Sequence, residues 1–170
     1  MSSSSENSGF SHLAAAFGGF LFATWAAREA LADSKKSRAE IDFPEEAGEA
    51  FAEISQLLDA WEPSDDCVTE DDFTQDLAQY LADNSEWRIE VCPSTQEGKP
   101  DILIDDLIAL ELKVDPNKNE RNRCIGQCAG YSRQWITWMV IIDSSPSKIG
   151  ELQRLLADKG LEHILVFDFS

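Results

Sequence analysis

The chain has 170 residues, enough for one domain with a substantial hydrophobic core but not comfortably for two. Its 14 basic and 32 acidic residues give a formal net charge of −18, which argues against sequence-independent duplex binding through a basic face. Four cysteines are too few for a disulfide-stapled secreted module. Salt screens the repulsion between dense carboxylates, so we expect a cytoplasmic protein from a high-salt organism.

The charge is unevenly distributed along the chain. Residues 39–87 contain no Lys or Arg and sixteen acidic residues. Residues 113–133 reverse the balance, with five basic residues against two acidic ones. We expect an anionic partner to contact this second stretch, because it carries a local excess of positive charge.

The N-terminal region combines a polar tail with an apolar segment, and together they form the first expected unit, residues 1–33. The tail, residues 1–9, is expected to be disordered. Residues 10–27 carry no charge and are expected to form a helix with a row of small residues, a pattern typical of closely packed membrane helices. Its strictly apolar part is shorter than a usual membrane span. Two interpretations stay open: an anchor at the inner face of a membrane, or a helix packed on the domain or on a second copy of the chain.

Two helices are expected next. Residues 34–66 are interpreted as a polar linker followed by an acidic helix that starts at Phe43-Pro44. The second helix has Thr69 as its N-cap, with Asp72 three residues later.

The remaining chain, within a domain assigned to residues 67–170, alternates between strands and helices. A strand with one buried face is expected at residues 87–91, because apolar and polar residues alternate there. The later elements are expected as follows: strands at 101–105 and 107–114 joined by a turn at Asp105-Asp106, a helix at 119–134, a strand buried on both faces at 137–142, a helix ending at Lys159-Gly160, and a strand at 163–169. This order predicts an α/β sandwich with a mixed sheet.

Three ionisable residues on the expected hairpin point to chemistry. Glu111 and Lys113 are two positions apart on a strand and therefore share a face. Asp101, at the start of the paired strand, would lie beside Glu111. Two neighbouring carboxylates repel each other unless a cation lies between them, and oxygen ligands suit Mg²⁺. A metal-bound water near Lys113 would become a nucleophile, which predicts hydrolysis of a phosphodiester. The other interpretation is an ion pair on a surface strand.

The spacing of these residues resembles a known signature. Pro100-Asp101, followed after nine residues by Glu111-Leu112-Lys113, resembles the motif of the PD-(D/E)XK nuclease superfamily. The expected elements between about residues 69 and 142 are similar to its αβββαβ core. The resemblance implies a restriction endonuclease-like three-layer sandwich, extended by a further helix and strand. It also implies a Mg²⁺-dependent endonuclease that hydrolyses DNA, with Mn²⁺ as a substitute and no small-molecule cofactor.

The resemblance also implies roles for individual residues. Asp101, Glu111 and the backbone carbonyl of Leu112 would bind the metal, and Lys113 would position the attacking water. Glu70 would reach the metal through water, as an acidic residue on the first core helix does in many members. Its other interpretation is pairing with the positive end of the helix dipole.

The helix after the lysine supplies the remaining candidates. Gln127 and Tyr131 match a Gln and a Tyr that several branches carry there, with Gln127 assigned to catalysis and Tyr131 to nucleic-acid binding. Four residues apart, they would share one helical face; their other interpretation is ordinary helix surface and core. The candidate phosphate contacts are Arg121, Arg123 and Arg133. Asp76 is a second choice for the role given to Glu70.

Alternatives to a DNA-cleaving enzyme stay open. The same fold also hosts inactive DNA-binding or structural subunits. Such a subunit could also be associated with a membrane. A homodimer would supply contacts that an acidic monomer lacks. The four cysteines have no zinc or iron–sulfur spacing, so we expect buried free thiols.

Overall fold

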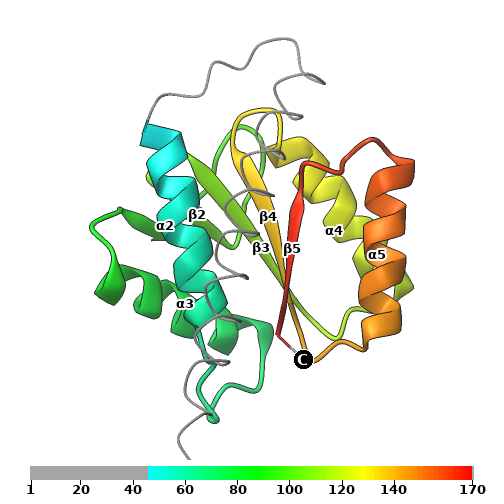
Figure 1. The fold of residues 1–170 in the computed structure, drawn as a ribbon, viewed down its shortest axis with the longest axis horizontal. Coiled ribbons are helices and arrows are strands. Elements are labelled where there is room, and N and C mark those ends of the chain that lie inside the picture. The colour runs from blue at the N-terminus through cyan, green and yellow to red at the C-terminus, as the bar shows by residue number, and fades with distance from the viewer. Residues whose placement is uncertain (1–45, 170) are drawn as a thin grey trace, which may run out of the picture. The chain divides into compact units, whose positions relative to one another are not determined.

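The computed structural model describes residues 46–169. The expected tail, the apolar segment at 10–27 and the start of the acidic helix lie outside the described residues. None of the described helices is both long and apolar enough to cross a membrane. The described elements, in chain order (Figure 1), are α2 (Glu46–Ala60), α3 (Glu70–Asn84), β1 (Ile89–Val91), β2 (Ile102–Ile104), β3 (Ile108–Val114), α4 (Lys118–Tyr131), β4 (Ile136–Ile142), α5 (Pro146–Asp158) and β5 (Leu165–Phe169).

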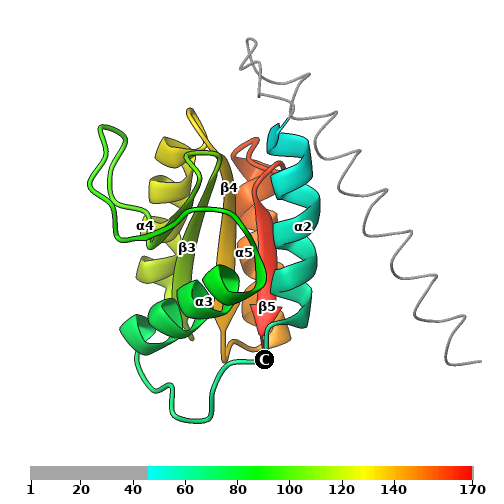
Figure 2. The same ribbon diagram turned by 90° about the vertical axis from the view of Figure 1, so that its left-hand side faces the viewer.

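The strands form one sheet between two layers of helices. The strand order is β1-β2-β3-β4-β5. The pairs β1–β2 and β2–β3 are antiparallel, and the pairs β3–β4 and β4–β5 are parallel. α2 and α3 lie on one face of the sheet, and α4 and α5 lie on the other (Figures 1 and 2). The expected α/β sandwich with a mixed sheet is therefore confirmed, and α5 and β5 are the expected further helix and strand.

Strand β4 carries the core of the protein, because all seven of its residues are buried. Its side chains alternate between the two helical layers. Trp138 packs edge-on against Phe51 of α2, with ring centroids 5.1 Å apart. Met139, on the other face, lies in a cluster with Cys128 of α4 and Leu152 of α5. The prediction of a strand buried on both faces is confirmed.

Helix α2 packs on the same sheet as the elements that follow it. Ile54 and Leu58 have no exposed surface. At the C-terminal end of the helix, Trp61 packs against Phe169 of β5 with ring centroids 4.9 Å apart. The acidic helix is therefore part of the sandwich, and Glu49, Glu53 and Asp59 are exposed on it.

Local signals in the sequence set several boundaries. The predicted cap of α3 is confirmed: the Asp72 N–H donates to Thr69 Oγ1 at 3.3 Å, and the Thr69 N–H donates to Asp72 Oδ2 at 2.8 Å. The turn between β2 and β3 is also confirmed. Asp105 and Asp106 both adopt positive φ angles, 47° and 59°, as a type I′ hairpin turn requires.

Strand β1 differs from its prediction. The alternation at residues 87–91 predicted one buried face, but β1 is the outer strand of the sheet, and Val91 is 36% exposed. Helix α3 packs against β1. Trp87, just before the strand, is held by a side-chain hydrogen bond, in which its Nε1 donates to Glu53 Oε2 of α2 at 2.9 Å.

Leu77 on α3 tests how firmly this helix is packed onto the sheet. Leu77 has no exposed surface, so we expect Leu77→Ala to lower the free energy of unfolding by about 2–5 kcal/mol. Gln75 is exposed on the same helix, and Gln75→Ala should change the free energy of unfolding by less than about 0.5 kcal/mol. Urea denaturation of the three proteins measures both values. Equal stability of the two variants would contradict the packing of α3 described above.

Candidate functional site

The residues singled out by the sequence meet where strands β2 and β3 part. β2 begins at Ile102, which pairs with Leu110, and β3 continues to Val114 alongside β4. Past Leu110, the edge of β3 that faces β2 has no partner strand among the described residues. Backbone groups on this open edge need other partners.

Leu112 presents its backbone groups at the open edge, and side chains bind both. Its N–H donates to Asp101 Oδ2 at 2.7 Å. Its carbonyl oxygen accepts a hydrogen bond from the Lys113 ammonium. Asp101 is held in place by its own N–H, which donates to the Leu110 carbonyl at 3.1 Å. The early end of β2 thus leaves room for a carboxylate beside the Leu112 backbone.

Lys113 contacts three carboxylates. Its Nζ lies 2.8 Å from Glu70 Oε1, 3.1 Å from Glu111 Oε1 and 3.7 Å from Asp101 Oδ2. Glu70 is 43 positions from Lys113 in the sequence, and the packing of α3 against the sheet brings it to the site. The predicted shared face of Glu111 and Lys113 is confirmed by their contact. We call Glu70, Asp101, Glu111 and Lys113 the ionic cluster.

The ionic cluster runs from the interior to the surface. The side-chain exposures are 1% for Glu111 and 8% for Lys113, against 20% for Asp101 and 43% for Glu70. An ion pair on a surface strand, the alternative interpretation, is therefore wrong for Glu111 and Lys113. The cluster opens to solvent on the side of Glu70.

Burial and mutual repulsion shift the protonation of the cluster. Burial, followed by the negative charge of Asp101, raises the pKa of Glu111 from 4.5 to about 7. Burial also raises the pKa of Asp101, against the opposing charge of Lys113. Burial alone would lower the pKa of Lys113, but the charges of Glu111 and Asp101 outweigh it and leave the pKa above its ordinary value. Lys113 is therefore cationic at neutral pH.

The donor chemistry of the cluster fits a hard divalent cation. Its oxygen atoms belong to carboxylates and one backbone carbonyl, the ligand types that Mg²⁺ prefers. Glu111 Oε2 is buried and has no hydrogen-bond partner, so it has an unused acceptor. No three Asp, Glu, His or Cys side chains within the described part of the chain stand in a ligating arrangement around a common point. The centre of the carboxylates is taken by the Lys113 ammonium instead.

Gln127 and Tyr131 lie on α4, next to the cluster. Tyr131 is 2% exposed, and its hydroxyl donates to the Lys99 carbonyl at 2.8 Å. Burial raises its pKa to about 12, and a hydrogen bond with Gln127 acts in the opposite direction. Gln127 is half-buried and also accepts from Arg123 Nε at 3.4 Å. Tyr131 therefore holds the loop that leads into Asp101, which is a positioning role and not the surface contact expected for nucleic acid.

The three candidate arginines have different environments. Arg121 is 5% exposed, its Nη2 lies 2.6 Å from Glu151 Oε2, and its Nη1 donates to the Pro116 carbonyl at 2.8 Å. These contacts join α4 to α5 and leave Arg121 a structural residue, because its guanidinium is enclosed. Arg123 and Arg133 are exposed and stay candidate phosphate contacts.

Several of these contacts had no signal in the sequence. Asp76, the second choice for a metal role, accepts a hydrogen bond from Trp61 Nε1 at 2.9 Å. The partners of Tyr131 and Arg121 are 32 and 30 positions away in the chain. Pairings of this kind depend on how helices pack on the sheet, which spacing alone does not encode.

The cysteines match their prediction in part. All four are free, and Cys124 and Cys128 are buried on α4. Cys92 is exposed and Cys67 is half-buried, so the expected burial is wrong for these two. Cys67 lies in the loop before α3, and Cys92 lies in the loop after β1.

Comparisons of the chain with known protein families, with curated proteins and with solved structures found no match.

The raised pKa of Glu111 predicts a pH-dependent stability. The folded state binds more protons than the unfolded state between pH 4.5, the ordinary pKa of Glu, and about pH 7. The stabilising effect is complete below the unfolded pKa and is lost as the pH rises through the folded one. In EDTA, the free energy of unfolding should therefore fall by about 1–3 kcal/mol between pH 5 and pH 8.

Denaturation at several pH values measures the slope of the free energy of unfolding against pH. Glu111→Gln should make this slope smaller, because it removes the titrating group. Glu49→Gln, an exposed change on α2, should keep the slope of the wild type. A slope unchanged in Glu111→Gln would show that another group is responsible.

The loop held by Tyr131 packs closely against the tyrosine ring at Gly98. Gly98 has a φ of +132°, and a Cβ built there would lie 2.9 Å from Tyr131 Cε1. Gly98→Ala should therefore destabilise the protein by about 1–3 kcal/mol. Gly126, on the exposed side of α4, has no atom within 4 Å of such a Cβ, so Gly126→Ala should stabilise the protein by up to about 1 kcal/mol. Thermal unfolding of both variants checks the opposite signs, and a stabilising Gly98→Ala would contradict the close packing of this loop.

Proposed function

We propose that this protein is a metal-dependent endonuclease that hydrolyses phosphodiester bonds in DNA, with a site of the PD-(D/E)XK type. One observation carries the proposal. Asp101, Glu111, Lys113 and the carbonyl of Leu112 converge at the open edge of β3, where a scissile group can approach from solvent. This convergence brings the Asp101 carboxylate, which precedes β2, to the Glu111 carboxylate and the Leu112 carbonyl of β3, beside a lysine whose charge is retained at neutral pH.

The fold supports the proposal at a coarser level. The order from α3 to β4 is helix, three strands, helix, strand, which equals the αβββαβ order of the superfamily core. Glu111 and Lys113 lie on the third of these strands, and Asp101 comes immediately before the second. The finer assignment, a restriction endonuclease-like fold, is part of the proposal.

Each group of the site has a proposed role. Asp101, Glu111 and the Leu112 carbonyl would hold Mg²⁺, or Mn²⁺ in its place, and Glu70 would act through water. The bound ion supplies a water of lowered pKa and neutralises charge on the phosphate. Lys113 would orient the attacking water and stabilise the negative charge that develops on the phosphate oxygens.

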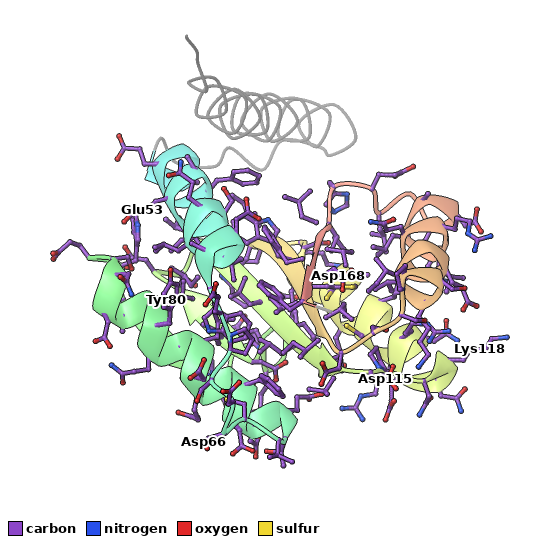
Figure 3. All side chains as sticks on the ribbon, turned by 60° about the horizontal axis from the view of Figure 1, so that its bottom comes forward. Glu53, Asp66, Tyr80, Asp115, Lys118 and Asp168 are labelled. Carbon is purple, nitrogen blue, oxygen red and sulfur yellow. The ribbon has the colours of Figure 1, made fainter. Side chains whose placement is uncertain are left out.

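The distribution of charge favours an approach of DNA from the side of α4. Figure 3 shows Glu53 and Asp66 on the side of α2 and α3, and Lys118 on the side of α4. Arg123 and Arg133 are also exposed there, at α4 and just after it. These few cations would bind DNA weakly, so the metal and a second copy of the chain would supply further contacts. A salt-rich cytoplasm is the proposed setting for the acidic remainder.

A second candidate function is an inactive DNA-binding or structural subunit. The observation that favours it is the contact of Lys113 with all three carboxylates, which also describes a buried ionic cluster with a purely structural role. Such a cluster would tie α3 to the sheet without any bound metal.

Cleavage assays separate the two candidates. In about 2–3 M KCl with Mg²⁺ or Mn²⁺, a concentration chosen so that salt screens the acidic surface, the full chain should cut plasmid, branched or single-stranded DNA. Asp101→Asn, Glu111→Gln and Lys113→Met should each lose at least about a hundredfold in rate, because each removes a group that acts on the reacting phosphate.

Asp143→Asn is the matched control. Asp143 is exposed after β4, with a φ of 54° that Asn also tolerates, so the variant should cut as the wild type does. Equal cleavage by all variants, or no cleavage of any of the three substrates, would overturn the enzymatic function. Metal-independent binding of DNA without cleavage would favour the second candidate.

A further inference from the structure

The oxygens that Lys113 contacts are the same ones assigned above to a metal. Its Nζ lies 3.1 Å from Glu111 Oε1 and 3.7 Å from Asp101 Oδ2, and it donates to the Leu112 carbonyl. A Mg²⁺ ion bound directly to these oxygens would lie about 2.0–2.1 Å from each of them. The ammonium and the ion would then be two cations within one small, largely buried space, where charges repel strongly.

We infer that Lys113 is the resident cation of this site and has to leave the three inner oxygens before a divalent metal binds. The ammonium keeps the buried carboxylates neutralised in the metal-free protein. Metal affinity is correspondingly lower than the carboxylates alone would give, because the metal competes with a tethered charge. This inference rests on the proposed metal requirement and adds a competition within the site.

Glu70 gives the displaced ammonium a place to stay. Its Oε1 is the nearest carboxylate oxygen to Nζ, at 2.8 Å, yet its side chain is 43% exposed and lies on α3, outside the strand edge. A shift of Nζ toward Glu70 keeps one ion pair while freeing Asp101, Glu111 and the Leu112 carbonyl. Glu70 therefore acts as a positioning residue for Lys113.

The charge of the cluster favours a divalent over a monovalent occupant. Three carboxylates face one ammonium, so full ionisation leaves an excess of two negative charges. Glu111 Oε2, which is buried and has no hydrogen-bond partner, carries part of this negative charge. A divalent ion compensates the excess, whereas a monovalent ion would only replace the ammonium already present.

Metal binding without turnover tests the inference. Binding of Mn²⁺ is measured by calorimetry on the full-length wild type, on Lys113→Met and on Lys99→Met. Lys99 is exposed two positions before Asp101, so its removal deletes a nearby positive charge that does not contact the carboxylates. We expect the Kd for Mn²⁺ to fall at least tenfold in Lys113→Met and by less than threefold in Lys99→Met.

The outcomes separate this inference from the proposed function. Binding by the wild type with an equal or higher Kd in Lys113→Met would overturn the competition while the metal site stands. Equal decreases of the Kd for Mn²⁺ in Lys113→Met and Lys99→Met would also overturn the competition, because the loss of one positive charge anywhere near the site would explain them. Failure of the wild type and Lys113→Met alike to bind Mn²⁺ would instead reject the proposed metal requirement. Asp101→Asn identifies the site, since it should abolish binding.

A measurement on the unmodified chain covers the case in which Lys113→Met does not fold. The ammonium nitrogen of a buried, paired lysine can be followed by NMR. Saturating Mg²⁺ should shift the Lys113 signal by more than the signal of Lys148, which pairs with Asp115 at the surface. Equal shifts, or none, would overturn the inference. The uncharged Lys113→Gln is a second variant for the calorimetry and should also bind Mn²⁺ more tightly than the wild type.

Discussion

The contact of the Lys113 ammonium with three carboxylates is the interaction on which the site depends. Glu111 is almost fully enclosed, and an uncompensated charge there would be costly. Lys113 neutralises it and, through Glu70, also ties helix α3 to strand β3. The same ammonium thus joins the buried carboxylates of the sheet to helix α3. In the proposed enzyme it would also have to make way for the metal, so one cation would serve both the fold and the reaction.

The open edge of β3 creates the space for this cluster. If β2 extended past Ile102 alongside β3, its backbone would bind Leu112, and Asp101 would have no place beside it. The loop before Asp101 is instead held by Tyr131, whose hydroxyl donates to the Lys99 carbonyl. The short strand β2 and the buried Tyr131 together place the Asp101 carboxylate beside the Leu112 backbone of β3.

Much of the fold was predictable because its signals are local. The Thr69 cap, the turn at Asp105-Asp106 and the apolar run that became β4 each depend on a few consecutive residues. Strand β1 was harder, because alternation in the sequence does not reveal whether a strand lies at the centre or at the edge of a sheet. Its exposed side follows from the strand order alone.

The sequence by itself determined that Glu111 and Lys113 share a face, because side chains two positions apart on a strand always do. It also indicated a strongly acidic chain with a basic stretch at residues 113–133. Only the tertiary structure decided that Lys113 stands between the carboxylates, that Glu70 rather than Asp76 joins them, and that Arg121 is enclosed by Glu151. These outcomes depend on how α3, α4 and α5 pack against the sheet. Packing joins residues far apart in the chain, and spacing along the chain does not reveal such distances.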